Sequence, residues 1–252
     1  MFKSYSEIFD QRGEAYHQAM KLSPDARNVE FATVLEQAKL TDGLVICDMP
    51  SGGGYLQDKL PANLHIHLIS IESSRQFSRN FEDGNSVESH LCALDATPLD
   101  DASVDRVVSI AGLHHLEYRL DVFLEMKRML RQGGRLCILE VPEGAITAAF
   151  LNEFVHEHNQ MGHIGVFIDH HFRKDLAQAG FILKTDERRS YTWNFKDVGQ
   201  MVRYAKLMFG IDLATDDQIL AGISRYLGYT CSTSGCHMNW ELQLLYAELD
   251  VD

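Results

Sequence analysis

Short apolar runs alternate with helix-like segments between residues 44 and 141, and this alternation constrains the fold more than any other feature of the chain. The strand-like runs, rich in Val, Ile and Leu, occupy residues 44–48, 64–72, 87–92, 104–111 and 135–141. The helical candidates between them occupy residues 54–60, 73–80 and 118–131. Strands that alternate with helices form a parallel sheet covered on both faces. We therefore predict an α/β fold with a Rossmann-like, doubly wound, mostly parallel sheet, and functional residues just beyond the carboxyl ends of its strands.

The charge and hydropathy of the chain exclude some partners. The net charge of −13 opposes non-specific binding to a polyanion, so we expect no nucleic-acid partner. No apolar run approaches the ~18–20 residues that a membrane-spanning helix needs. The first residues also lack the apolar segment of a secretory signal. We therefore expect a cytoplasmic protein that does not bind a membrane, and the sequence gives no sign of its oligomeric state.

Cysteine usage favours the same compartment. The five cysteines are Cys47, Cys92, Cys137, Cys231 and Cys236. Their odd number and wide spacing argue against a disulfide framework and for a reducing environment. The last two could form a metal site or a redox pair. However, their C-x4-C spacing is unusual for zinc and no second half-site follows, so we predict no metal site.

The stretch "CDMPSGGGYL" places three glycines directly after the first strand-like run. Glycine permits positive φ and lets a ligand touch the bare backbone, although a tight turn without a ligand would also use it. A phosphate-binding P-loop is excluded because Tyr55 and Leu56, not Lys and Ser or Thr, follow the glycines. A dinucleotide fingerprint would need a third glycine where Gln57 stands. An NAD-dependent oxidoreductase is therefore the less favoured alternative.

Four ordered segments resemble the motifs of class I S-adenosylmethionine-dependent methyltransferases, and most closely those of the type 11 methyltransferase domain. "VICDMPSGGG" resembles the first motif, with Asp48, Gly52 and Gly54 in register, and "LISIESS" resembles the second, with Glu72 at the strand end. "LDATPLDDASVDRVVSIAGLHHL" resembles the third and fourth motifs. "EMKRMLRQGGRLCILEV" resembles the helix and strand that follow them. The resemblance is strong over residues 44–141 and weaker elsewhere.

The resemblance implies a domain organisation and a function. It implies a seven-stranded sheet in a single methyltransferase domain that spans residues 1–252. Within it, residues 1–42 would form an N-terminal helical lid, residues 43–141 a cofactor-binding core, and residues 142–252 the substrate-covering helices and closing strands. The implied activity is methyl transfer from S-adenosylmethionine to a small-molecule acceptor, which suits the low basicity of the chain.

The resemblance also implies which residues hold the cofactor. Glu72 would accept hydrogen bonds from both ribose hydroxyls, a task suited to the two oxygens of a carboxylate. Asp95 would accept from the adenine amine, with the amide of Ala96 facing a ring nitrogen, and Asp48 would lie near the methionine end. The other expected contacts are Tyr16, Ser51, Gly52, Gly53, Gly54 and Ala111. Helix capping or loop hydrogen bonds remain alternative roles for Glu72 and Asp95.

One residue departs from the family pattern. Pro50 stands where the first motif has its first glycine, which fixes φ and removes one amide donor. We expect cofactor binding to survive because the later glycines make the close contact. The departure keeps open the alternative of a non-catalytic S-adenosylmethionine-binding or interaction protein on the same fold.

Histidines are the candidate catalytic residues. His114 and His115 follow the fourth strand, where methyl group and acceptor should meet, and His163 lies in a glycine-flanked loop that should cover the substrate. Histidine titrates near neutral pH and could take a proton from the acceptor. The alternative is that one of the paired histidines packs in the core while the other faces solvent. The aromatic and Met residues of 190–230 could line a pocket or belong to the core.

Overall fold

The computed structural model describes residues 3–81, 84 and 86–250, and its centre is one eight-stranded sheet. The strands are β1 (Val45–Asp48), β2 (His67–Glu72), β3 (Val87–Leu91), β4 (Val104–Ile110), β5 (Leu130–Glu140), β6 (Phe181–Phe195), β7 (Tyr229–Ser232) and β8 (Gly235–Leu249). Their order is β3-β2-β1-β4-β5-β8-β6, with β7 paired to β8. Strands β1 to β5 are parallel, and β8 is antiparallel between β5 and β6. The predicted doubly wound fold is confirmed, and β7, a short hairpin partner of β8, adds one strand to the expected seven.

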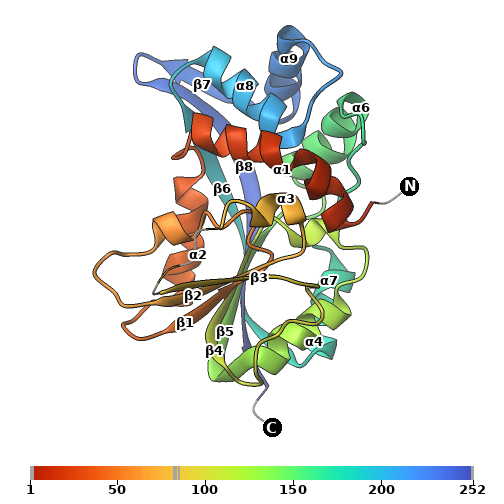
Figure 1. Cartoon of the computed structure of the whole chain (residues 1–252). Helices are drawn as coiled ribbons and strands as arrows, with labels where there is room; N and C mark the ends of the chain where they lie inside the picture. The colour runs from red at the N-terminus through yellow and green to blue at the C-terminus, as the bar shows by residue number, and fades with distance from the viewer. Residues whose placement is uncertain (1–2, 82–83, 85, 251–252) are drawn as a thin grey trace.

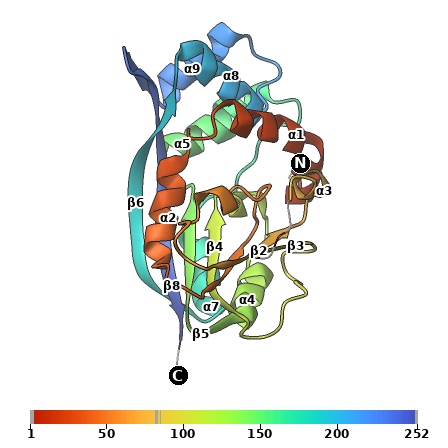
Figure 2. The same ribbon diagram turned by 60° about the vertical axis from the view of Figure 1, so that its left-hand side comes forward.

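Helices cover both faces of this sheet. They are α1 (Tyr5–Leu22), α2 (Asn28–Ala38), α3 (Arg75–Ser78), α4 (Leu120–Met129), α5 (Ile146–Ala149), α6 (His156–His158), α7 (His170–Gln178), α8 (Val198–Phe209) and α9 (Asp216–Tyr226). Helix α2 packs on one face against β4 and β5, whereas α4 and α7 pack together on the other face. Figures 1 and 2 show α1 crossing above the carboxyl ends of the strands. The connection between α5 and α6 is a π-helical turn, Phe150–Val155.

Two cores follow from the alternation of side chains along the strands. Ile46 and Val108 point to the core shared with α2, whereas their neighbours Cys47 and Val107 point to the core shared with α4 and α7. Successive side chains of a strand point to opposite faces of a sheet. Because all four residues are fully buried, the central strands are covered on both sides.

The sequence fixes where α1 begins and how it is held. Ser4 and Glu7 form a capping box. The Ser4 hydroxyl accepts a hydrogen bond from the Glu7 amide, and the Glu7 carboxylate accepts one from the Ser4 amide. The carboxylate of Asp10 accepts from the Ser74 hydroxyl (2.9 Å) and the Arg75 amide (2.7 Å) at the start of α3. These contacts dock the N-terminal helix at the edge of the sheet where β2 ends.

The expected helix at 54–60 is wrong. The chain there forms turns and a single 3-10 turn, η1 (Gln57–Lys59). Gly52, Gly53 and Gly54 have φ values of +59°, +101° and +81°, a left-handed conformation that does not lead into an α-helix. The glycine turn therefore presents its amides from a loop, without the N-terminus of a helix behind it.

The cysteines also differ from expectation. Cys231 and Cys236 form a disulfide across the β7–β8 hairpin, although the odd number and wide spacing of the cysteines argued for a reducing environment. Cys47, Cys92 and Cys137 are free. Across residues 3–81, 84 and 86–250, no helix combines the length and the apolar character that crossing a membrane requires.

Candidate active site

Glu72 ends β2 and is fully buried at the centre of the site. Its Oε2 accepts from the Tyr5 hydroxyl (3.0 Å) and the Gly52 amide (2.9 Å). Its Oε1 accepts from the amides of Ser73 (2.7 Å) and Ser74 (2.8 Å). Burial raises the pKa of Glu72 to about 7, even though these hydrogen bonds favour the ionised form. The carboxylate is at the predicted strand tip, and the protein itself supplies four donors to it.

Asp48 ends the neighbouring strand and is almost fully buried. Burial and then the charge of Glu72 raise the pKa of Asp48 well above its ordinary value. Asp48 lines a small pocket together with Ser51, Gly52 and Arg27. The Ser51 hydroxyl is buried and has no hydrogen-bond partner among the described residues. The pocket therefore combines one acidic side chain, one cation and bare backbone.

The three glycines of the turn have different roles. A Cβ on Gly52 would meet nothing within 4 Å, so its backbone is open toward the small pocket. A Cβ on Gly53 would come within 3.1 Å of the Tyr55 ring, and one on Gly54 within 3.2 Å of the Phe81 ring. All three positions have positive φ, which favours glycine. Only Gly52 offers open backbone to a ligand, whereas Gly53 and Gly54 also lie close to aromatic rings.

Asp95 lies on the far side of Glu72, exposed at the rim of an open pocket. Leu91 and Leu94 line the same pocket and give it an apolar wall. The amide of Ala96, which was expected to face an adenine nitrogen, donates instead to the carbonyl of Ala93 (3.4 Å). Asp95 thus lies at the rim of this pocket, whereas the amide of Ala96 is already used within the loop.

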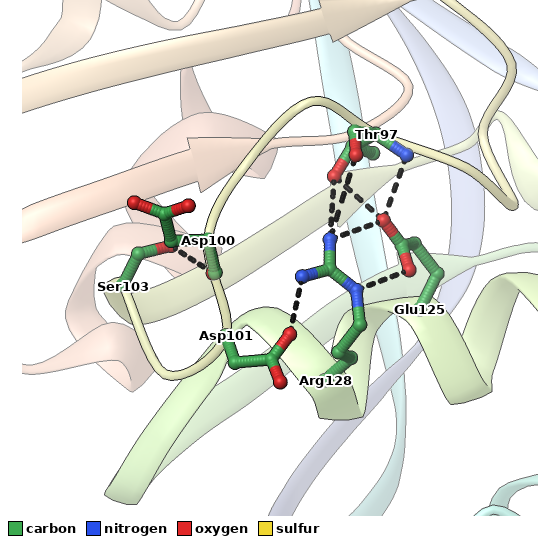
Figure 3. A network of polar contacts seen from close by, with 6 residues as sticks. All are labelled: Thr97, Asp100, Asp101, Ser103, Glu125 and Arg128. Atoms are coloured by element: carbon green, nitrogen blue, oxygen red, sulfur yellow. Dashed lines mark hydrogen bonds and ion pairs between the residues drawn. The ribbon is translucent and has the colours of Figure 1, made fainter.

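A hydrogen-bonded network fixes the loop that carries Asp95 (Figure 3). The carboxylate of Glu125 on α4 accepts from the amide and the hydroxyl of Thr97, each at 2.7 Å. Arg128 donates to Glu125 (2.7 and 2.8 Å) and to Asp101 (2.7 Å). The hydrogen bonds from Arg128 and Thr97 lower the pKa of Glu125 to about 2. The rim of the open pocket is thus held by an ionised group on the helix below it.

Helix α1 fills the space between the two pockets. Tyr5, which is 4% exposed, and the Gly52 amide both donate to Oε2 of Glu72. Tyr5 lines the pocket of Asp95, whereas Gly52 lines the pocket of Asp48. Phe9, one turn further on, lies with its ring centroid 4.7 Å from those of Tyr5 and Phe77. The resemblance predicts Tyr16 as the covering residue, and the structure places Tyr5 on Glu72 instead. The capping box just before it was the signal that places Tyr5 at the start of the helix.

Arg27 and Tyr16 form the junction between the small pocket and a larger cavity, because both line both spaces. The Arg27 guanidinium donates to Glu30 (2.7 Å) and to the Tyr16 hydroxyl (2.6 Å), and Trp193 Nε1 donates to Glu30 (2.6 Å). Arg27 and Glu30 are both buried. Burial opposes the charge of Arg27, but the carboxylate of Glu30 outweighs it and raises the pKa of Arg27. Arg27 is a site residue that no sequence motif indicates.

The larger cavity lies beyond this junction and is partly open to solvent. Trp193, Phe209 and Trp240 stack along its wall, with ring centroids 4.4 to 5.9 Å apart. Ala111, with a φ of +50°, and Val141 line it beyond the ends of β4 and β5. Of the aromatic and Met residues of 190–230, Trp193, Met208 and Phe209 reach this cavity. Tyr191, Phe195, Met201 and Tyr204 belong to the core without lining it.

The structure brings the three candidate histidines together in the cavity wall. His114 and His115 form the 3-10 turn η2 (Leu113–His115), and their ring centroids lie 5.7 and 5.3 Å from that of His163. His114 Nδ1 lies 2.7 Å from the buried carboxylate of Glu140. Burial, followed by the charge of His114, lowers the pKa of His115 and of His163 well below the ordinary value. Neither member of the paired histidines faces solvent.

Residues 47–138 match the family model described as a methyltransferase domain, of the type 11 family. This segment starts next to Asp48 and reaches into β5, so it contains the strand tips that carry Glu72 and Asp95. The fold is that of the class I methyltransferases, and residues 47–138 form a methyltransferase domain of the type 11 family. No curated protein matches the sequence.

Solved structures share this fold at low sequence identity. A protein assigned as a methyltransferase, in complex with the Trm112 methyltransferase activator of Haloferax volcanii, matches with a TM-score of 0.68 and 19% identity over 99% of both chains. The [4+2]-cyclase SpnF matches with a TM-score of 0.67 and 13% identity over 97% of this chain and 94% of that one. Geranyl diphosphate C-methyltransferase from Streptomyces coelicolor A3(2), solved with Mg²⁺, geranyl diphosphate and S-adenosyl-L-homocysteine, matches with a TM-score of 0.57 and 14% identity over 88% and 79%. At these identities the likeness shows the fold alone.

Proposed function

We propose that the protein transfers a methyl group from S-adenosylmethionine to a small-molecule acceptor in the aromatic-walled cavity. The pair of buried carboxylates at adjacent strand tips, Asp48 and Glu72, carries this proposal. They stand between an open pocket on one side and the junction to the cavity on the other. The methyltransferase domain over residues 47–138 supports the same reading.

The two pockets fit the two ends of the cofactor. Asp48 and Arg27 bring a carboxylate and a guanidinium to one small pocket, which suits the ammonium and carboxylate of a methionine moiety. The open backbone of Gly52 lies beside them. On the other side, Asp95 and the apolar wall of Leu91 suit an adenine base, whose amine donates and whose faces are apolar.

The ribose would lie at Glu72, between the pockets, and it fits only after one hydrogen-bond donor to Glu72 is replaced. The Tyr5 hydroxyl already occupies Oε2, so a ribose hydroxyl would replace the Tyr5 hydroxyl there. One hydrogen bond to a carboxylate substitutes for another, which keeps the net cost of the exchange small. We infer that α1 is a lid and that its first turn moves away from β2 when the cofactor enters.

The chain's own residues would then position the acceptor and keep water out. S-adenosylmethionine supplies a methyl group that is already activated on a sulfonium centre, so orientation and desolvation are the main tasks left to the protein. The stacked wall of Trp193, Phe209 and Trp240 suits a flat, apolar acceptor. His115 and His163, neutral at pH 7 because burial lowers their pKa, can accept a proton if the acceptor must lose one.

A second function, cofactor binding without methyl transfer, is favoured by one observation. All four donors on Glu72 come from the protein itself, so the closed site is stable without a ligand. The [4+2]-cyclase SpnF, which shares this fold, is named for an activity other than methyl transfer.

Thermal melting of the purified protein with different ligands separates the possibilities. We expect S-adenosylmethionine and S-adenosylhomocysteine to raise the melting temperature and NAD to leave it unchanged, because a ligand that binds the folded state alone stabilises it. A shift with NAD alone would support an oxidoreductase and overturn the proposal. A shift with S-adenosylmethionine, followed by no S-adenosylhomocysteine release with any of a panel of aromatic acceptors, would favour binding without turnover.

A further inference from the structure

Three histidines from two distant segments converge on one point of the cavity wall. His114, His115 and His163 each offer a ring nitrogen within 4.8 Å of those of the other two. A tetrahedral ion about 2.0–2.1 Å from each nitrogen would hold its ligand atoms about 3.4 Å apart. Small side-chain rotations would therefore bring all three nitrogens to a single ion.

Partners on the opposite ring nitrogens already orient two of these histidines. His114 Nδ1 faces the buried carboxylate of Glu140, which also accepts from the amides of His114 (3.1 Å) and Val141 (2.7 Å). Because Glu140 is the acceptor for both amides, it is also the acceptor opposite His114, and Nδ1 of His114 carries the hydrogen. A carboxylate behind a histidine in this way is the usual outer support of a metal ligand.

His163 is held in a similar way. Its Nδ1 lies 3.1 Å from Oδ1 of Asn152, and the same side chain bonds the amide (2.8 Å) and the carbonyl (3.0 Å) of Gly165. Asn152 thus clamps the loop that carries His163 to the π-helical turn between α5 and α6. The ring is oriented by the fold and does not depend on contact with its histidine neighbours.

His115 supplies an independent sign of a missing ligand. It is 7% exposed, and its Nδ1 has no hydrogen-bond partner among the described residues. Buried polar atoms rarely lack a partner, so an unpaired imidazole nitrogen in this cluster points to a bound species.

We propose that His114, His115 and His163 bind one divalent transition-metal ion, with an open coordination position toward the cavity. Three imidazoles suit Zn²⁺, Co²⁺, Fe²⁺ or Ni²⁺ more than Mg²⁺ or Ca²⁺, which prefer oxygen ligands. Three protein ligands with a free fourth position are typical of catalytic metal centres. The expectation that the free position faces a methyl acceptor rests on the proposed function. Binding of the ion does not depend on that function. With an ion bound, the histidines would hold it and would not accept a proton.

Cobalt titration of the full chain, stripped of metal with a chelator, tests this inference. We expect one equivalent of Co²⁺ to bind, with visible absorption bands of a low-coordinate centre that Zn²⁺ removes by competition. His163→Gln should weaken binding by more than about 100-fold, beyond the cost of losing an outer hydrogen-bond partner. A matched control is His171→Gln, in the exposed cluster Asp169, His170 and His171, which should leave Co²⁺ affinity unchanged.

Two results of the cobalt titration would contradict the metal site. Absence of the absorption bands, or bands that survive His163→Gln and vanish in His171→Gln, would overturn the proposal. A crystal soaked in Zn²⁺ gives a check that needs no variant: an anomalous difference peak between the three ring nitrogens is expected, and a peak only at His170 and His171 would refute the site. Neither measurement depends on methyl transfer, so failure here would leave the cofactor proposal standing, and failure of cofactor binding would leave the metal proposal standing.

Discussion

The two halves of the site are built in different ways. The strand-tip half, with Asp48, Glu72 and Asp95, comes from one stretch of chain that follows successive strands of the sheet. The cavity half is assembled from α1, η2, the turns around α6, β6, α8 and β8, which are far apart in the sequence. The first half is polar and lies within the family domain, whereas much of the second is aromatic and lies outside it.

This contrast indicates which half is general and which is particular to this chain. Backbone amides and carboxylates at strand tips follow from the doubly wound topology and serve any chain that binds the same cofactor. An aromatic wall depends on residues that no topology dictates, so it can change with the acceptor. The comparison predicts that variants of the first half alter cofactor binding and variants of the second alter acceptor choice.

The largest effect is expected at Arg27, which belongs to both halves. Arg27→Met would leave the buried carboxylate of Glu30 without its partner, which costs about 3–5 kcal/mol in the free energy of unfolding. Urea denaturation measures this loss. The double variant Arg27→Met/Glu30→Gln, which keeps an acceptor for Trp193, should recover part of it. A single-variant cost below about 1 kcal/mol would contradict the buried pair as the junction of the two halves.

The next effect concerns the rim of the strand-tip half. Glu125→Gln should lower the free energy of unfolding by about 2 kcal/mol at pH 7, because a buried charged acceptor of several hydrogen bonds is lost. The folded-state pKa of about 2 lies below the ordinary value of 4.5, so this contribution is present above pH 4.5 and is lost as the pH falls toward 2. Urea titrations at several pH values should therefore show the variant and the wild type converging in acid.

Asp101→Asn is the matched control for this network. Asp101 accepts from the same Arg128, but its side chain is 81% exposed, so its loss should change stability by less than about 0.5 kcal/mol. Equal losses in Glu125→Gln and Asp101→Asn would show that burial at α4 is not what holds the loop of Asp95.

A smaller effect, on affinity, is expected for Glu72→Gln. The variant should bind S-adenosylhomocysteine at least about tenfold more weakly at pH 8, since hydrogen bonds to a charged acceptor are worth more than about 1.4 kcal/mol. The pKa of Glu72 is about 7 because the group is buried, with Tyr5 and Asp48 facing it, so the carboxyl is protonated below that value. Wild-type affinity should therefore rise from pH 6 to pH 8. Calorimetry that finds the same pH profile in Glu72→Gln would remove Glu72 from the site.

The smallest effect is expected for Tyr5→Phe, and its sign is the informative part. The substitution removes the hydroxyl that competes for Glu72 and keeps the ring in its aromatic cluster. Affinity for S-adenosylhomocysteine should rise by about two- to tenfold, the worth of one hydrogen bond of about 0.5–1.4 kcal/mol. Tyr229→Phe on β7 should leave it unchanged. A fall in affinity would mean that Tyr5 contacts the ligand instead of standing in its place.

Much of the strand-tip half could be predicted from the sequence. The alternation of strands and helices fixes which residues follow which strand, and the carboxylates Asp48, Glu72 and Asp95 stand at or just beyond the ends of β1, β2 and β3. The role of each glycine could not be predicted, because Gly53 and Gly54 are set against Tyr55 and Phe81, contacts that depend on side-chain packing.

The cavity half shows where sequence reasoning stops. His114, His115 and His163 were identified one by one, but their meeting depends on a loop held by Asn152, which no local pattern reveals. Tyr5 was missed because hydrophobic periodicity shows that α1 is a helix and does not show what lies under its first turn. The disulfide of the β7–β8 hairpin likewise depends on strand pairing that spacing alone does not fix.

The central claim is that Glu72 binds the ribose of S-adenosylmethionine after the first turn of α1 withdraws. A crystal structure of the full chain with S-adenosylhomocysteine tests it most directly. The account predicts ribose hydroxyls on the carboxylate of Glu72, the methionine end between Asp48 and Arg27, and the Tyr5 hydroxyl displaced. A ligand bound elsewhere while Tyr5 stays on Glu72 would contradict it.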